Sequence, residues 1–272
     1  MKEQTETSLL GRIVEYPETY NPSVLRTIDR MSQRKQLGLL DTSFHGEDLW
    51  TSYEFSWIDG SGKPQVRILE IRVPCLSRFT VESKSLKLYL NSYAQTMFSS
   101  VEEIKAALTD DLSAIIEAGV AVKIYSIPAY SENQTDLMGD CLDDLEVETS
   151  DYLRSPGLLV TSKQSSGPIE ETVFTNLFRC LCPITGQPDW ATIIVKYYGP
   201  SIERTALLKY LISYRNHQGF HESTIELIYS DLSQLQPNKI SVFGCFLRRG
   251  GIDIQPFRSN YEGVPPYYRQ VR

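Results

Sequence analysis

Two stretches of the chain, Ser85-Leu-Lys-Leu-Tyr-Leu-Asn-Ser-Tyr93 and Ala206-Leu-Leu-Lys-Tyr-Leu-Ile-Ser-Tyr214, share one pattern of apolar, tyrosine and serine positions. Both have the periodicity of a helix with one buried face. The sequence that follows each stretch also matches. Asp111-Leu112-Ser113 aligns with Asp231-Leu232-Ser233, and the offset between matched segments stays near 120 to 124 residues. Similarity at a constant offset indicates an internal repeat.

The segments around these two helices predict the same order of elements in each half. In the first half, alternating apolar residues broken by Asp59-Gly60-Ser61-Gly62 predict a hairpin over 49–73. Helices at 85–94 and 101–116 follow, the second ended by Ala118-Gly119, and then a strand at 120–127. The second half predicts strands at 171–181 and 190–198, helices at 203–215 and 222–235, and strands at 240–247 and from 252 onward.

The repeat predicts an α+β fold of two tandem ββααββ units, with an antiparallel sheet and helices on one face. Expected boundaries are 1–130 for the first unit, 131–156 for an acidic linker or edge strand, and 157–272 for the second unit. The turn segment Gly62-Lys63-Pro64 aligns with Gly186-Gln187-Pro188. The same offset aligns Ile58 with Cys182. Two unrelated α+β domains are the alternative.

Composition narrows the class of protein. The chain has 272 residues, 41% of them hydrophobic and 22% charged, as in a globular protein. A net charge of −7 argues against electrostatic binding of nucleic acid. The polar N-terminus argues against a signal peptide. The lack of a long apolar run argues against a membrane-spanning helix. Five scattered cysteines and three histidines predict a cytoplasmic protein with reduced thiols and no metal site.

The hairpin that contains Cys182 carries the strongest chemical pattern. Pro183 and the Thr185-Gly186-Gln187-Pro188 stretch predict a tight turn that brings Cys182 close to Asp189, a nucleophile beside a proton donor. A buried, inert Cys182 beside a turn-capping Asp189 is the alternative, and for an arbitrary cysteine it is the better one. The presence of the thiol in only one of the two repeats favours chemistry. Cys180 lies two residues before Cys182, and no second pair completes a zinc set.

Two further stretches combine polar groups with turns. Gly219-Phe220-His221-Glu222 begins a helix, where Glu222 could accept N–H groups of a purine-like edge or only stabilise the helix terminus. Arg248-Arg249-Gly250-Gly251 could bind phosphate or form a solvated turn. No glycine-rich Rossmann motif follows a strand.

These segments together resemble the NADPH-dependent 7-cyano-7-deazaguanine reductases, the nitrile reductases of queuosine biosynthesis. The resemblance covers about 10–258 and rests on four motifs in the family's order. They are Val81-Glu-Ser-Lys-Ser-Leu-Lys-Leu-Tyr-Leu90, Cys182-Pro-Ile-Thr-Gly-Gln-Pro-Asp-Trp190, Phe220-His221-Glu222, and Arg248-Arg-Gly-Gly-Ile-Asp-Ile-Gln-Pro256. The chain is similar to the family's long form, in which one half carries the Glu-Ser-Lys signature and the other the cysteine.

The resemblance implies a tunnelling fold (T-fold), a homodimer, and four-electron reduction of a nitrile to an amine by NADPH without a metal. Cys182 would form a thioimide, with Asp189 as the proton donor. The deazapurine would contact Glu82, Glu222, His221 and the main chain of Val81 and Ser83, and His221 would help catalysis or shape the pocket. The residues that match NADPH contacts are Ser83, Lys84, Arg249 and Gly250. Alternatives are a cyclohydrolase-like enzyme of the same fold and a non-catalytic purine-binding paralogue.

Overall fold

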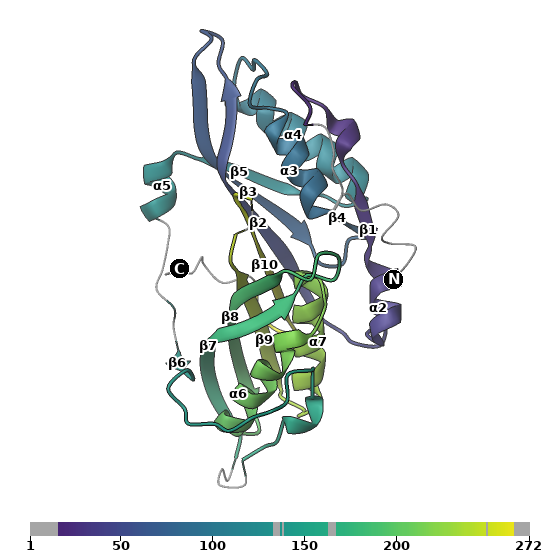
Figure 1. Cartoon of the computed structure of the whole chain (residues 1–272), viewed down its shortest axis with the longest axis vertical. Helices are drawn as coiled ribbons and strands as arrows, with labels where there is room; N and C mark the ends of the chain where they lie inside the picture. The colour runs from purple at the N-terminus through teal and green to yellow at the C-terminus, as the bar shows by residue number, and fades with distance from the viewer. Residues whose placement is uncertain (1–15, 133–136, 138, 163–166, 249, 264–272) are drawn as a thin grey trace. The chain divides into compact units, whose positions relative to one another are not determined.

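Contacts along the chain divide it into two compact units. Met1–Gln33, Asp48–Gln134 and Arg248–Asp253 form unit 1, and Arg34–Glu47, Thr135–Leu247 and Ile254–Arg272 form unit 2. The computed structural model describes residues 16–132, 137, 139–162, 167–248 and 250–263 (Figure 1). Strands β2 (His45–Ile58) and β10 (Ile252–Ser259) contribute residues to both units.

Unit 1 places its main strands in the order β5-β3-β2. Strand β3 pairs antiparallel with β5, from Ile68 opposite Tyr125 to Arg72 opposite Ala121. A separate two-stranded ladder joins β1 to β4. The elements are η1 (Pro22–Val24), β1 (Thr27–Asp29), the start of α2 (Arg30–Leu37), β2, β3 (Pro64–Pro74), β4 (Phe79–Val81), α3 (Ser83–Asn91), α4 (Val101–Ile116), β5 (Ala121–Tyr125) and α5 (Ile127–Glu132).

Helix α4 shows how local sequence sets an element. The Ser100 Oγ accepts the Glu103 N–H at 3.1 Å, which caps the first turn. Apolar residues at every fourth position, Ile104, Leu108 and Leu112, are buried along one face. The helix ends where Glu117 adopts a left-handed φ of 56°, so Glu117 and not the predicted Gly119 is the terminating residue.

Unit 2 orders its strands β10-β9-β8-β7-β6, antiparallel except for the β6–β7 pair. Helices α6 and α7 pack on these strands (Figure 1). The elements are β6 (Asp140–Cys141), η2 (Pro156–Leu158), β7 (Ile169–Leu181), β8 (Pro188–Gly199), α6 (Arg204–Ser213), η3 (Tyr214–Asn216), α7 (His221–Ser233), β9 (Lys239–Phe246) and most of β10. A Cβ at Gly244 of β9 would lie 2.5 Å from the Ile225 side chain, so glycine lets α7 approach the sheet closely.

A buried tyrosine–aspartate cluster joins the two helices of unit 1. The Tyr89 hydroxyl donates to Asp111 Oδ2 at 2.6 Å and lies 2.7 Å from the Tyr93 hydroxyl. Ser92 Oγ donates to the Tyr89 carbonyl and accepts the Asn21 N–H at 3.1 Å. Burial raises the pKa of Tyr89, so its hydroxyl remains a donor.

Unit 2 contains the same cluster, built from the residues that the repeat had matched. The Tyr210 hydroxyl donates to Asp231 Oδ2 at 2.5 Å and lies 2.9 Å from the Tyr214 hydroxyl. Ser213 Oγ donates to the Tyr210 carbonyl and accepts the Ser155 N–H at 3.1 Å. The two units therefore share specific buried interactions as well as their order of elements.

The observed elements follow most of the predicted order, with mostly antiparallel strands in a mixed α and β architecture. The edge strand predicted within 131–156 is β6. The first half differs at its end, because β5 is followed by helix α5 and not by a second closing strand among the described residues. The short ladder β1–β4 and helix α2 were not predicted, since neither has a long periodic pattern. No helix in the described part of the chain is long and apolar enough to cross a membrane.

Candidate active site

Cys182 directly follows strand β7 and is 7% exposed. Its N–H donates to the Gln187 carbonyl at 2.8 Å, and its own carbonyl accepts the Gly186 N–H at 3.0 Å. Gly186 has a φ of 68°, which a residue without a Cβ adopts most easily. The turn returns the chain so that Asp189 pairs directly with Cys180, and strand alternation puts Cys182 toward the same face.

The segment before α7 is hydrogen-bonded to the end of β7. The Leu181 N–H donates to the His217 carbonyl at 2.8 Å, and the Gly219 N–H donates to the Leu181 carbonyl at 3.1 Å. A Cβ at Gly219 would lie 2.7 Å from Thr224 Oγ1, so this position needs glycine. These bonds bring the start of α7, with His221 and Glu222, beside the Cys182 hairpin.

His221 meets Asp189 at this junction. The His221 Nε2 lies 3.4 Å from Asp189 Oδ2, and the two side chains are 12% and 5% exposed. The imidazole stacks on the Phe246 ring with centroids 3.9 Å apart and planes 5° from parallel. His221 Nδ1 is buried without a hydrogen-bond partner among the described residues. An acid and an imidazole held this close can pass a proton to a bound molecule.

Phe246 was not predicted as a site residue. It ends β9 opposite Ala191, two residues after Asp189 in β8. This register places Phe246 on the strand next to the one that carries Asp189. Only the strand register reveals this, because nothing in the local sequence of β9 distinguishes Phe246 from the neighbouring Phe243.

Glu222 lies in the first turn of α7 and is 6% exposed. The positive end of the helix dipole stabilises a carboxylate at this position. Cys182, Asp189, His221 and Glu222, predicted from separate motifs, all belong to unit 2.

The Glu-Ser-Lys signature forms the N-terminus of α3 in unit 1. Glu82 is 1% exposed, and its carboxylate accepts the Lys84 N–H at 3.1 Å and the Ser85 N–H at 2.8 Å. Val81 is buried as the last residue of β4, and its neighbour Glu82 donates its N–H to the Arg26 carbonyl at 2.8 Å. Glu82 is therefore fixed by its own helix, with Ser83 and Lys84 in the first turn.

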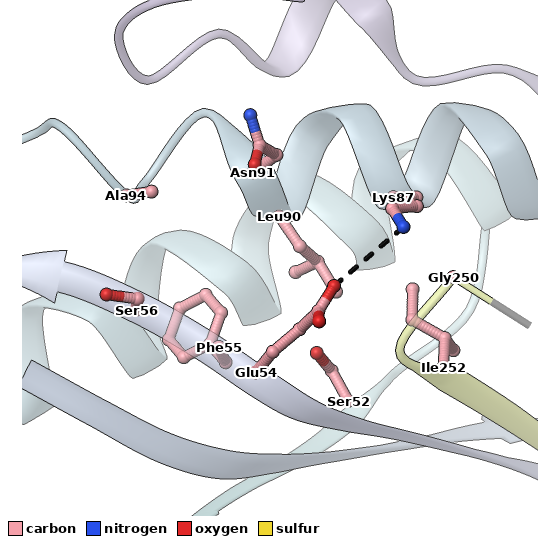
Figure 2. Close-up of a pocket in the computed structure, with 10 residues that line it drawn as sticks. All are labelled: Ser52, Glu54, Phe55, Ser56, Lys87, Leu90, Asn91, Ala94, Gly250 and Ile252. Atoms are coloured by element: carbon pink, nitrogen blue, oxygen red, sulfur yellow. Dashed lines mark ion pairs between the residues drawn. The ribbon is translucent and has the colours of Figure 1, made fainter. Parts of the chain in front are cut away.

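A cavity of about 350 Å³ lies beside α3 in unit 1. Figure 2 shows Lys87 of α3 pointing toward Glu54 of β2, with Gly250 beside them, and the Nζ to Oε1 distance is 3.8 Å. A Cβ at Gly250 would lie 2.5 Å from Lys87 Nζ, so a larger residue would displace that ammonium group. Gly250 and Gly251 both have positive φ values, 59° and 84°. Arg249, predicted with Gly250, lies outside the described residues.

The alignment of Ile58 with Cys182 is wrong by one residue. Ile58 exchanges backbone hydrogen bonds with Thr96 and Phe98, as Leu181 does with His217 and Gly219. The counterpart of Cys182 is therefore Asp59, whose N–H donates to the Lys63 carbonyl and whose carbonyl accepts the Gly62 N–H. Hydrogen bonds from Ser61 and Gln65 hold the pKa of the Asp59 carboxyl well below its usual range. The first repeat thus has a turn-stabilising carboxylate where the second has the thiol.

Within the described residues, no group of three or more His, Cys, Asp or Glu side chains is placed to hold a metal ion. None of the five cysteines forms a disulfide. Cys180 is buried within strand β7, directly opposite Asp189.

Comparison with known proteins now identifies the family. A family described as "Nitrile reductase, 7-cyano-7-deazaguanine-reductase N-term" matches residues 16–124, and one described as "QueF-like protein" matches residues 188–264. A protein of Desulfotalea psychrophila named NADPH-dependent 7-cyano-7-deazaguanine reductase is 45% identical over 93% of this chain and 92% of its own length. The chain belongs to the 7-cyano-7-deazaguanine reductase family.

Other relatives of this name support the assignment across the whole chain. The Chromobacterium violaceum reductase is 42% identical over 96% of this chain and 94% of its own length. The Burkholderia cenocepacia reductase is 43% identical over 96% of both chains. The alignments therefore span residues of both units, and the two family models match one segment in each half of the chain.

Proposed function

We propose that the chain reduces the nitrile of 7-cyano-7-deazaguanine to the primary amine of 7-aminomethyl-7-deazaguanine, a step of tRNA queuosine biosynthesis, with NADPH as reductant. The observation that carries the proposal is the His221–Asp189 pair, 3.4 Å apart, beside the hairpin whose turn begins at Cys182. Family membership indicates the class of substrate. The His221–Asp189 pair can donate the proton that the nitrile nitrogen needs when the carbon is attacked.

The first step is addition of the Cys182 thiolate to the nitrile carbon. A C–S bond forms, one π pair of the C≡N bond moves to nitrogen, and Asp189 protonates that nitrogen to give a thioimide. Hydride addition to the thioimide carbon follows, the C–S bond breaks with its electron pair on sulfur, and an imine remains. A second hydride and a further proton complete the four-electron reduction to the amine. Throughout, His221 holds or resupplies the proton at Asp189.

Recognition of the deazaguanine is proposed to rest on two buried carboxylates, Glu222 in unit 2 and Glu82 in unit 1. Each can accept N–H groups from the guanine-like edge, and the main chain of Val81 and Ser83 would add contacts. An analogue that lacks those N–H groups cannot form these hydrogen bonds to charged acceptors, so it would bind more weakly.

NADPH supplies the two hydrides when it is bound. The residues of unit 1 that fit its phosphates are Lys87 of α3 and the positive-φ Gly250-Gly251 turn, which lie together beside the cavity, and Glu54 would have to release Lys87 for a phosphate to bind there. Lys84, in the first turn of α3, is proposed as a further contact. Ser83 and Arg249 are proposed to complete this contact. No metal is proposed.

The fold family, the location in the cell and the oligomeric state are also proposed from family membership. We infer two T-fold units, a first within 1–130 and a second within 157–272, and a cytoplasmic homodimer. The duplicated Tyr–Asp clusters support the pair of related units.

The deciding experiment is intact-mass measurement after mixing the protein with 7-cyano-7-deazaguanine without NADPH. Wild type should gain the mass of one nitrile per chain, and Cys182→Ala should gain none. Cys180→Ala is the matched control, since it removes a thiol from the same strand and should still form the adduct. If wild type forms no adduct, or Cys182→Ala still does, the covalent mechanism is wrong.

A further inference from the structure

Two arginines share one tryptophan ring beside the Cys182 hairpin. The guanidinium carbon of Arg179 lies 5.9 Å from the centre of the Trp190 ring, and that of Arg215 lies 5.5 Å from it. Arg179 of β7 is directly opposite Trp190 of β8, whereas Arg215 comes from η3. All three side chains are half-buried.

The charges of this cluster are not paired within the part of the chain that the structure describes. Neither Arg179 nor Arg215 forms an ion pair with the described residues, although the chain has a net charge of −7. Elsewhere in unit 2, Arg154 pairs with Asp231 and Arg258 pairs with Glu226. The Arg179 Nε is buried without an acceptor among the described residues, which is costly unless a ligand supplies one.

We propose that Arg179 and Arg215, held by Trp190, bind a phosphate group of NADPH. This inference rests on the proposed function. The ring holds the flat faces of the guanidinium groups by cation–π attraction, which leaves their N–H edges available for bidentate bonds to phosphate. NADPH is the polyanion that the reaction brings to this protein, and each of its three phosphate groups is a ligand that two guanidinium groups can bind.

The place of the cluster suits a part of the cofactor remote from the reacting atoms. Strand alternation puts Arg179 and Trp190 on the face of the hairpin opposite to Cys180 and Asp189. A phosphate bound there stays apart from the nucleophile, and in NADPH the phosphates are likewise separate from the nicotinamide ring that gives up hydride. Phosphate binding and thioimide formation should therefore respond to different mutations.

The test compares Arg179→Met and Arg215→Met with Arg67→Met. Arg67 is a matched control because its guanidinium carbon lies 5.7 Å from the centre of the Trp57 ring in unit 1 and its side chain is also half-buried. Each site variant should raise KM for NADPH about tenfold, the loss expected for one charged hydrogen bond, with kcat changed far less. Inorganic pyrophosphate and 2′,5′-ADP should inhibit wild type competitively with NADPH and inhibit the site variants more weakly.

Adduct formation at Cys182 separates this inference from the proposed function, because it needs no NADPH. Site variants that form the adduct normally but lose NADPH affinity support the phosphate site, as does partial recovery in Arg179→Lys. An unchanged KM for NADPH and unchanged pyrophosphate inhibition in both variants would overturn it. So would a lower oligomeric mass with an unchanged KM, since the arginines would then bind another copy of the chain.

Discussion

In unit 1, Gln65 Nε2 donates a hydrogen bond to Asp59 Oδ2 at 2.8 Å across the first hairpin. Asp59 is the counterpart of Cys182, and the matching prolines Pro64 and Pro188 make Gln65 the counterpart of Asp189. The hairpin shared by the two units thus brings these two side chains into hydrogen-bond contact in the copy without the thiol. Cys182 and Asp189 occupy the corresponding positions of the hairpin in unit 2, whose turn is one residue longer, and this supports the proposal that Asp189 acts on a group bound to Cys182.

Asp189→Asn should slow turnover by about 10²-fold or more, because the amide cannot deliver a proton to the nitrile nitrogen. KM for the nitrile should change only a few-fold, since Glu82 and Glu222 are left intact. Asp59→Asn is the control and should leave kcat unchanged. Steady-state kinetics checks both variants, and wild-type turnover in Asp189→Asn would remove the proton-donor role.

Phe246→Leu should lower kcat about fivefold, because loss of the stacked ring lets the His221 imidazole leave its position near Asp189. The control is Phe243→Leu, which changes the other face of the same strand, in the cluster with Ile194 and Phe257. Both variants should lower the free energy of unfolding by a similar amount, because each loses part of a buried ring. Only the Phe246 variant should alter the pH profile of kcat. Identical profiles in the two variants would show that the stack has only a packing role.

Asp231→Asn should lower the free energy of unfolding by about 3 kcal/mol, because it leaves Arg154 without its carboxylate in a largely buried site. Arg154 Nε and Nη2 donate to Asp231 at 2.9 and 2.5 Å, so both bonds are lost or weakened. The equivalent Asp111→Asn change disturbs only tyrosine partners in the described part of unit 1 and should cost about 1 kcal/mol. Urea unfolding measures both values.

The Arg154→Met Asp231→Asn double variant completes a mutant cycle. Its loss of stability should be smaller than the sum of the single losses, since neither charge is left alone. Additive losses would mean that the ion pair contributes little.

Asp253→Asn should change how stability depends on pH. Burial raises the pKa of Asp253 to about 7 from 3.8, although the Tyr53 hydroxyl donates to it at 2.7 Å and Arg248 lies nearby. A carboxyl with a raised pKa in the folded state binds a proton there that the unfolded chain has released. It therefore stabilises the fold below about pH 4, and this contribution is lost as pH rises to about 7.

The difference in unfolding free energy between wild type and Asp253→Asn should thus shift in favour of the variant by a few kcal/mol between pH 4 and pH 8. Unfolding in urea at several pH values measures it. Two curves that run parallel would place the Asp253 pKa near its ordinary value.

Much of the fold could be predicted because its signals are local. The bounds of α4 follow from a capping serine and one apolar face, and the hairpin turn that begins at Cys182 follows from its glycine and prolines. The end of unit 1 could not be predicted in this way. Helix α5 occupies a short polar segment with weak periodicity, where contacts with the rest of the unit decide the conformation.

The sequence alone determined which residues are proposed to carry the chemistry, since the motifs around Glu82, Cys182, His221 and Gly250 are each short and contiguous. Only the tertiary structure decided which side chains meet. It placed His221 against Asp189 and Phe246, gathered Arg179 and Arg215 on Trp190, and made Asp59 the partner position of Cys182. Strand register and the path of each loop set these contacts, and a shift of one residue in a strand reverses which face every side chain occupies.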